Sequence, residues 1–157
     1  MRHDIYPLPP EKAEHLLPLL DVVHSLHVMH QPERYLANPD PERLLPWLQD
    51  WLSDADVHCL ATGRPDLSGY LICEIERHPT SPLTPDRNRV TLHHISVLPR
   101  YQRQGIAQAL IRAMRDLART KGVTRIATTY ASFNGPSAAL MDAVGLRPVT
   151  ILAEGQV

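Results

Sequence analysis

The sequence predicts an α/β (α+β) fold, and two observations support this class. Strand-like and helix-like segments follow one another in the order β-α-α-β-β-β-α-β-α-β. The chain has 157 residues, of which 43% are apolar and 21% are charged, so it can build one core of ordinary composition. We therefore expect a single domain over residues 1–157.

The first third of the chain predicts one short strand and two helices. Residues 3–8, "HDIYPL", are a strand candidate, and leucines at helical spacing indicate a helix over residues 10–30. Pro18 lies within that helix, where it either causes a kink or marks the true start. A second helix is expected over residues 41–54, with Asp40 as its N-cap and a proline at its first position.

Three strands are predicted in the middle of the chain. Residues 56–62 and 67–76 read as a hairpin joined by the turn "GRPD" at 63–66. Residues 77–89 contain three prolines and are expected to form a loop. The apolar run "VTLHHISVL" at 90–98 predicts the third of these strands.

The last third of the chain predicts two helices that alternate with two strands. The strongest helical pattern covers residues 103–122 and ends at Gly122, a suitable C-cap. A strand is then expected over 123–130, a helix over 134–145 and a final strand over 146–153.

Composition and charge exclude several classes of protein. The formal net charge is −1, so nothing electrostatic argues for a nucleic-acid or membrane partner. No apolar run approaches the roughly 20 residues of a membrane span, and the first residues lack the apolar stretch of a secretory signal. Cys59 and Cys73 are too few for a disulfide scaffold. We expect a cytoplasmic protein with free thiols.

The junction between the strand at 90–98 and the following helix is rich in hydrogen-bond donors. It carries Arg100 and Arg103 and no acidic residue. The first N–H groups of a helix have no partner within it and carry the positive end of its dipole. Gly105 and Ala107 lack bulk, so an anion can approach the backbone closely. The junction therefore predicts a phosphate cradle, with a solvated tight turn as the alternative.

Two common phosphate-binding motifs do not fit this junction. A P-loop requires Gly-Lys followed by Ser or Thr, which the sequence lacks. A dinucleotide fold requires three spaced glycines and an acidic residue at the end of the next strand, but that strand, "VTRIATTY", has no acid.

A third motif fits better. The hexapeptide "QRQGIA" at 102–107 resembles the Gln/Arg-x-x-Gly-x-Gly/Ala signature of the GNAT acetyltransferases, and the longer segment 95–111 resembles that family position after position. The segment "FNGPSAALMDAVGLRPV" at 133–149 is similar to the second half of the same family, with Asn134 and Ser137 at its characteristic positions. The resemblance covers nearly the whole chain.

The resemblance implies a GNAT fold, with a mixed, mostly antiparallel central sheet flanked by helices. It also implies direct transfer of an acetyl group from acetyl-CoA, as co-substrate, to a primary amine of a small-molecule or amino acid-like acceptor. The acetyl-CoA-binding residues implied are Val97, whose backbone pairs with pantetheine, Arg103, Gln104, Gly105, Ile106 and Ala107 around the pyrophosphate, and Asn134 and Ser137 near the pantetheine or the sulfur. Asn134 also suits a plain helix N-cap, and both roles can hold together.

A histidine is expected to accept the proton of the amine. Alternation along the strand places His93 and Val97 on one face and His94 on the other, so we favour His93 as facing the reaction centre. The segment "LHHISV" also resembles arylalkylamine-type members, in which such a histidine is the base. The alternative is that His93 is structural or binds the substrate. His94 is expected to be structural. Glu74 and Glu76 either act through water or face solvent.

The sequence departs from the family at the expected acid. Many members place a tyrosine seven residues after the asparagine, where this chain has Met141. Either the thiolate leaves unassisted or another donor serves, with Tyr130 and Ser137 as candidates. We predict His93 and Tyr130 as the catalytic pair.

The acceptor is expected to contact the first two helices and their loop, with His30 and Tyr35 as binding residues. His24, His27 and His30 lie one helical turn apart, but no carboxylate or cysteine falls at ligand spacing and no His-Glu-x-x-His motif is present, so no metal is predicted. Trp47 and Trp51 more simply form a packed helix face.

The sequence is also compatible with two other functions and with an oligomer. A non-catalytic acyl-CoA-binding regulator would fit Met141, and an unrelated nucleotide-phosphate-binding α/β domain would fit the isolated turn. A final strand at the edge of the sheet invites pairing, so we expect a homodimer through the C-terminal region.

Overall fold

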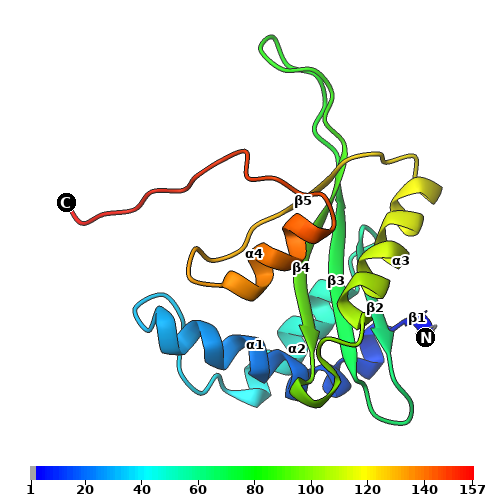
Figure 1. Cartoon of the computed structure of the whole chain (residues 1–157), viewed down its shortest axis with the longest axis vertical. Coiled ribbons are helices and arrows are strands. Elements are labelled where there is room, and N and C mark those ends of the chain that lie inside the picture. Colours follow the sequence, from blue (N-terminus) through cyan, green and yellow to red (C-terminus); the bar gives the residue numbers. More distant parts are fainter. Residues whose placement is uncertain (1–2) are drawn as a thin grey trace.

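In the computed structural model, which describes residues 3–157, a five-stranded sheet with the order β1-β2-β3-β4-β5 organises the chain (Figure 1). Strands β1 to β4 pair antiparallel with their neighbours, whereas β5 pairs parallel with β4. The strands are β1 (Ile5–Pro7), β2 (Val57–Thr62), β3 (Gly69–Glu76), β4 (Arg89–Val97) and β5 (Ile126–Thr128). The expected class, a mixed and mostly antiparallel sheet flanked by helices, is confirmed.

The helices follow the predicted order. They are the 3-10 helix η1 (Pro10–Leu16), α1 (Leu17–His30), α2 (Pro41–Leu52), the 3-10 turn η2 (Pro99–Tyr101), α3 (Ile106–Thr120) and α4 (Gly135–Ala143). Pro18 lies in the first turn of α1 and thus marks its true start, and the Asp40 side chain caps α2 by accepting from the Glu42 N–H at 3.0 Å. Within residues 3–157, no helix combines the length and the apolar character that crossing a membrane would require.

Strand β3 is buried on both faces and separates two apolar clusters. Tyr70 and Ile72 pack with the residues of α1 and α2, whereas Leu71 and Cys73 pack with α3. Figure 1 accordingly shows α3 on one side of the strands and α1 and α2 on the other. This alternation is the period of two that any strand imposes on its side chains.

Strand β4 contains a β-bulge that the sequence pattern did not predict. Ile72 of β3 pairs with His94, but the next residue, Cys73, pairs with Leu92, so His93 is an extra residue on β4. A bulge shifts the alternation of side chains by one position. The expectation that His93 and His94 point to opposite faces is therefore wrong, because both rings contact Trp51 of α2.

The same shift changes the partners of the residues after the bulge. Val97 was expected on the face of His93, but it packs against the α3 cluster instead. Ser96 points to the opposite face, where its hydroxyl donates to the carbonyl of Leu19 in α1 at 2.8 Å. The second half of β4 is thus tied to α1 on one face and to α3 on the other.

Strands β4 and β5 pair over three residues only. Their last pair joins Leu92 to Thr128, directly before the bulge. Strand β5 is therefore shorter than the strand expected at 123–130. After β5 the chain turns away from β4 and leads to α4 (Figure 1). The two strands part at the residue where the bulge begins.

The strand expected at 146–153 does not form. These residues have no regular structure and extend away from the sheet (Figure 1), with Val149, Ile151 and Leu152 largely exposed. Among residues 3–157 the segment has no strand partner, and a strand is stable only when its backbone groups are paired. The predicted element order is therefore correct up to α4.

Leu110 on the buried face of α3 offers a test of this packing. It is fully buried, so Leu110→Ala should lower the free energy of unfolding by about 2–5 kcal/mol, through lost transfer energy and the cavity left behind. Urea unfolding measures this change. Gln108→Ala, at an exposed position of the same helix, should change stability by less than about 0.5 kcal/mol. Equal effects of the two variants would contradict the placement of α3.

Candidate active site

The turn between β4 and α3 presents unpaired N–H groups to solvent. Arg103 and Gly105 both have positive φ angles, +60° and +80°, and the backbone passes through them into α3 at Ile106. The helix thus starts three residues later than the expected start at Arg103. No described side chain caps α3, so its first N–H groups remain available at the positive end of the dipole.

The space around Gly105 is open. A Cβ added there would meet no atom nearer than Nε2 of His3, at 3.9 Å, and residues 102–105 are exposed. Nε2 of His3 lies 2.8 Å from the carbonyl of Gln104, which holds the turn against the N-terminal segment. An anion can therefore reach the backbone from outside without displacing side chains.

Val97 leads into this turn and has its carbonyl partly engaged. The Gln102 side-chain amide donates to the Val97 carbonyl at 3.1 Å, while Val97 pairs with Gly69 of β3 on its other side. A carbonyl oxygen has two lone pairs, so this contact leaves one acceptor position on Val97. The Gln102 contact could not be predicted from the sequence, because it depends on the fold of the turn.

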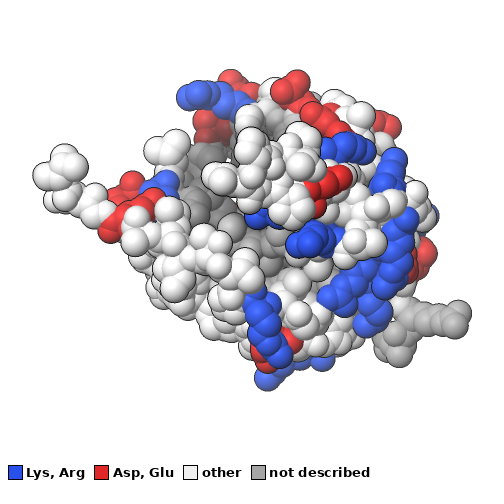
Figure 2. All heavy atoms as spheres, turned by 90° about the horizontal axis from the view of Figure 1, so that it is seen from above, with Lys and Arg blue, Asp and Glu red and all other residues white. Residues whose placement is uncertain are grey.

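Positive charge is concentrated beside α3. The formal net charge is only −1, yet Lys and Arg gather in Figure 2 on the right-hand side, where α3 lies in Figure 1. Arg112, Arg119, Lys121 and Arg125 are exposed along this helix and the segment that follows it. The small net charge therefore conceals a basic side along α3, with Arg119, Lys121 and Arg125 at the end of this helix that lies away from the donor-rich turn.

The start of α4 lies beyond the point where β4 and β5 part. The Asn134 side chain accepts from the Ser137 N–H at 3.1 Å and so caps α4. The N-cap alternative for Asn134 is therefore correct, and it does not exclude a second role for the free amide group. Ser137 is partly buried in the first turn of this helix.

Residues that the sequence keeps far apart form an aromatic cluster beside α1, made of His27, His30, Tyr35 and Phe133. The His30 ring stacks on Phe133 with centroids 4.2 Å apart and planes at 14°, and the His27 ring lies 5.0 Å from Tyr35 and 5.6 Å from Phe133. The predicted residues His30 and Tyr35 thus belong to one cluster, joined through Phe133 and His27. Phe133 was missed, although it is the only phenylalanine in the chain and precedes Asn134.

His24 has a different place from the other histidines of α1. One of its ring nitrogens lies 2.6 Å from the Leu36 carbonyl, so it anchors the loop that follows the helix. The rings of Trp47 and Trp51 lie along α2 with centroids 5.5 Å apart and planes tilted by 32°, but Trp47 is 54% exposed, so the two do not form the packed helix face that was expected. Trp51, however, also contacts both histidines of β4, a role that the helical spacing could not reveal.

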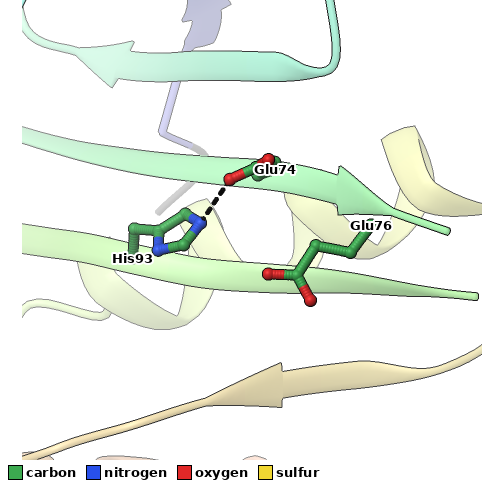
Figure 3. A group of neighbouring side chains, drawn as sticks. All are labelled: Glu74, Glu76 and His93. Atoms are coloured by element: carbon green, nitrogen blue, oxygen red, sulfur yellow. Dashed lines mark hydrogen bonds and ion pairs between the residues drawn. The ribbon is translucent and has the colours of Figure 1, made fainter. Parts of the chain in front are cut away.

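His93 is hydrogen-bonded to a carboxylate of the neighbouring strand. Its Nε2 lies 2.9 Å from Oε2 of Glu74, and the two side chains are 30% and 34% exposed (Figure 3). The pair is therefore sheltered but still within reach of solvent and small molecules. Neither strand spacing nor composition indicated this contact, because it crosses between strands next to the bulge.

His94 lies in a contrasting environment. Burial, together with the nearby His93 and His27, lowers the pKa of His94 to about 4. Its Nδ1 is buried and has no hydrogen-bond partner among the described residues. A ring with this pKa is neutral at pH 7, so the bulge places one neutral and one carboxylate-bound imidazole side by side.

Glu76 lies further along β3 and has other partners. Burial alone would raise its pKa, but hydrogen bonds from His78 and Arg89 lower the pKa of Glu76 to about 2. The ligand atoms of Glu74, Glu76 and His93 lie within 4.8 Å of one another, an arrangement not visible in the sequence. Arg89 binds Glu76 at 2.6 Å and would repel a cation there, so these residues support no metal assignment.

Position 141, where many family members have the acid, and the candidate Tyr130 differ in exposure. Met141 is 3% exposed and packs in the α3 cluster, so a tyrosine at this position would have to displace core side chains. Tyr130 follows β5 by two residues and is 37% exposed. Of the two positions, only that of Tyr130 leaves a hydroxyl accessible.

The sequence profile of the acetyltransferase (GNAT) family matches residues 22–146. Among proteins with curated functions, none matches the sequence. Among solved structures, a tetramutant of the BH1408 protein from Bacillus halodurans superposes with a TM-score of 0.87 at 18% identity, covering 98% of this chain and 99% of that one.

Two solved aminoglycoside acetyltransferases are also similar in fold. The aminoglycoside antibiotic 6'-N-acetyltransferase AAC(6')-Ih from Acinetobacter baumannii has a TM-score of 0.76 at 20% identity, with 99% of this chain and 98% of that one covered. Aminoglycoside N-acetyltransferase AAC(6')-Iy, solved with CoA, gives the same score and identity over 99% of this chain and 95% of that one. At such identities the likeness concerns the fold alone.

The low pKa of His94 predicts a pH-dependent loss of stability. Because the folded pKa lies near 4 and the unfolded value near 6.5, the unfolded chain binds more protons between these values, and stability falls as the pH falls. Between pH 7 and pH 5 this amounts to about 2 kcal/mol. In His94→Phe the free energy of unfolding should fall between pH 7 and pH 5 by about 2 kcal/mol less than in the wild type. Urea unfolding at both pH values measures this difference.

The control for this comparison is His15→Gln, at an exposed position of η1. It should show the wild-type pH dependence. A His94→Phe variant with the wild-type pH dependence would contradict the lowered pKa and the neutral state of this ring.

Proposed function

Because this chain belongs to the acetyltransferase (GNAT) family, we propose that it transfers an acetyl group from acetyl-CoA directly to a primary amine of a small-molecule acceptor. The observation that carries the proposal is the parting of β4 and β5 at the bulge, next to an uncapped start of α3. An extended chain can lie along the freed part of β4 while its phosphates meet the helix N-terminus.

Acetyl-CoA supplies the acetyl group as a thioester, and its pyrophosphate is the anion that suits the turn. The residues proposed to hold it are Arg103, Gln104, Gly105, Ile106 and Ala107, with the Val97 backbone along the pantetheine and Asn134 and Ser137 near its sulfur end. The positive φ of Gly105 and the open space around it support this assignment. The CoA bound in a solved structure of the same fold is in keeping with it.

The acceptor is proposed to contact His30 and Tyr35, together with His27 and Phe133 of the aromatic cluster. Stacked rings bind flat or apolar parts of a ligand and favour cations over their faces. Solved proteins of similar fold are named as aminoglycoside N-acetyltransferases, and aminoglycosides are small molecules that carry amines. These names support a small-molecule acceptor here. An amine exists mainly as an ammonium at neutral pH, so a base must remove one proton before it attacks.

His93 is proposed as that base and Tyr130 as the donor that protonates the departing thiolate. The exposure of both side chains leaves them accessible to a bound substrate. A hydroxyl donor need not be strong, because a thiolate is a tolerable leaving group near neutral pH. The buried position of Met141 supports the view that it packs and takes no part in the chemistry.

The two other functions differ in how well they fit this chain. The alternative of an unrelated nucleotide-phosphate-binding domain is excluded, because the match to the acetyltransferase family covers residues 22–146. A non-catalytic acyl-CoA-binding regulator keeps one argument, the methionine in place of the family tyrosine. Release of CoA in the presence of any amine would separate the enzyme from the regulator.

A homodimer in the cytoplasm forms part of the proposal. The exposed side chains of Val149, Ile151 and Leu152 are apolar, and a second copy would cover them.

Gly105→Glu tests the acetyl-CoA site. The added carboxylate would stand where the pyrophosphate is proposed to bind, so the affinity for acetyl-CoA should fall about tenfold or more. Isothermal titration calorimetry measures the change. Gly105→Ala imposes the same strain at φ +80° without the charge and meets no close atom, so it should retain affinity. Wild-type affinity in the glutamate variant would show that the pyrophosphate binds elsewhere.

His93→Ala tests the base. Turnover, followed as release of the CoA thiol across a panel of amines, should fall about 10²–10⁴-fold, while acetyl-CoA affinity stays near the wild type. The exposed His15→Ala serves as control and should keep the wild-type rate. If His93→Ala retained the wild-type rate at every pH, the proton would leave through water, and His93 would have no catalytic role.

A further inference from the structure

We propose that Glu74 is a positioning residue that holds the His93 ring with a proton on Nε2, so that Nδ1 is the atom that takes the proton of the acceptor amine. This inference rests on the proposed function, since it assigns the reacting atom of the proposed base. It goes further in naming a partner for His93 and in distinguishing the two nitrogens of its ring.

The hydrogen bond itself determines the tautomer. An ionised carboxylate only accepts hydrogen bonds, so the Nε2 that lies 2.9 Å from Glu74 Oε2 must be the donor. A neutral imidazole carries one proton, and its lone pair then lies on Nδ1. Figure 3 shows the second ring nitrogen on the edge of the ring away from Glu74.

The bulge brings these two residues together. In the antiparallel register Glu74 stands opposite Thr91, and His93 lies two positions further along β4, on the same face. The extra residue leaves His93 outside the regular pairing, and its ring turns back toward Glu74 (Figure 3). Trp51 of α2 meets the ring with centroids 5.5 Å apart and planes at 70°. The ring is thus held by a carboxylate and by an aromatic contact.

The other charged groups around His93 leave Glu74 as its direct partner. Glu76 on β3 is engaged by Arg89 of β4 and by His78, so its charge is largely offset. His94 beside it is neutral at pH 7, because burial lowers its pKa to about 4. His27 of α1 contributes a charge only when protonated. Glu74 is therefore the carboxylate that stabilises the imidazolium formed at His93.

The proton balance of the transfer follows. The acceptor ammonium gives one proton to Nδ1 of His93, and the imidazolium faces the Glu74 carboxylate until it releases this proton to water. The free amine forms the C–N bond as the C–S bond breaks. The second proton lost by the nitrogen passes to the thiolate, through Tyr130 or water, so that the products are the amide and CoA thiol.

The test compares Glu74→Gln with Glu74→Ala in pH–rate profiles of CoA release. The glutamine carbonyl can still accept from Nε2 but carries no charge, so the acid limb of the profile should move to lower pH by about 0.5–1 unit, with a small loss of maximal rate. The alanine variant loses the orientation as well, and its maximal kcat should fall about 10–100-fold. Wild-type profiles in both variants would overturn the inference.

Asp56→Asn is the matched control. Asp56 is also a carboxylate paired with a neighbouring side chain, Arg77 at 2.8 Å, but it has no contact with His93. Its removal should leave the pH–rate profile unchanged. A shift as large as that of Glu74→Gln would assign the effect to overall charge and would count against a specific role for Glu74.

A spectroscopic arm does not depend on turnover. In protein labelled with ¹⁵N-histidine, the His93 ring signals are identified by their loss in His93→Gln. At pH 8 the wild type should show the Nε2–H tautomer, and Glu74→Ala should show a mixture of both tautomers. An Nδ1–H tautomer in the wild type would overturn the inference, even if no acceptor amine has been found.

The two proposals fail in different ways. Absence of CoA release by the wild type with every amine would count against the proposed function, while the ring signals would still decide the Glu74–His93 contact. Turnover by the wild type with unchanged Glu74 variants would leave the acetyltransferase proposal standing and remove only the role of Glu74.

Discussion

The extra residue at position 93 of β4 is the constraint on which the site depends. One strand has to pair with β3 along its whole length, yet it pairs with β5 over only three residues. The bulge meets both requirements, because it bends the strand and shifts its side-chain alternation at the point where β5 leaves. Without it, β4 would be a regular strand, with His93 and His94 on opposite faces.

That shift also explains why two adjacent histidines have different chemistry. His93 remains accessible and is bound to Glu74, whereas His94 is half-buried beside Trp51 with a lowered pKa. Two titratable groups in contrasting environments are a common feature of sites that move protons at neutral pH. In this chain the contrast comes from backbone geometry, since both side chains are the same.

The rest of the fold holds this part of β4 in place. Ser96 ties it to α1, and the apolar face of α3 anchors the turn that follows, so the uncapped helix start is fixed relative to the bulge. The aromatic cluster joins α1 to the segment before α4 through His30 and Phe133. The proposed acceptor side is thus built on α1, which Ser96 ties to the strand that carries His93.

The sequence by itself determined the features that depend on local chemistry. It predicted the element order up to α4, the Asp40 and Asn134 caps and the donor-rich turn around Gly105, because each follows from neighbouring residues. Only the tertiary structure decided the bulge, the Glu74–His93 contact, the place of Phe133 and the missing strand at 146–153. These depend on register and on partners far away in the chain, and a strand pattern is the same whether or not a partner lies beside it.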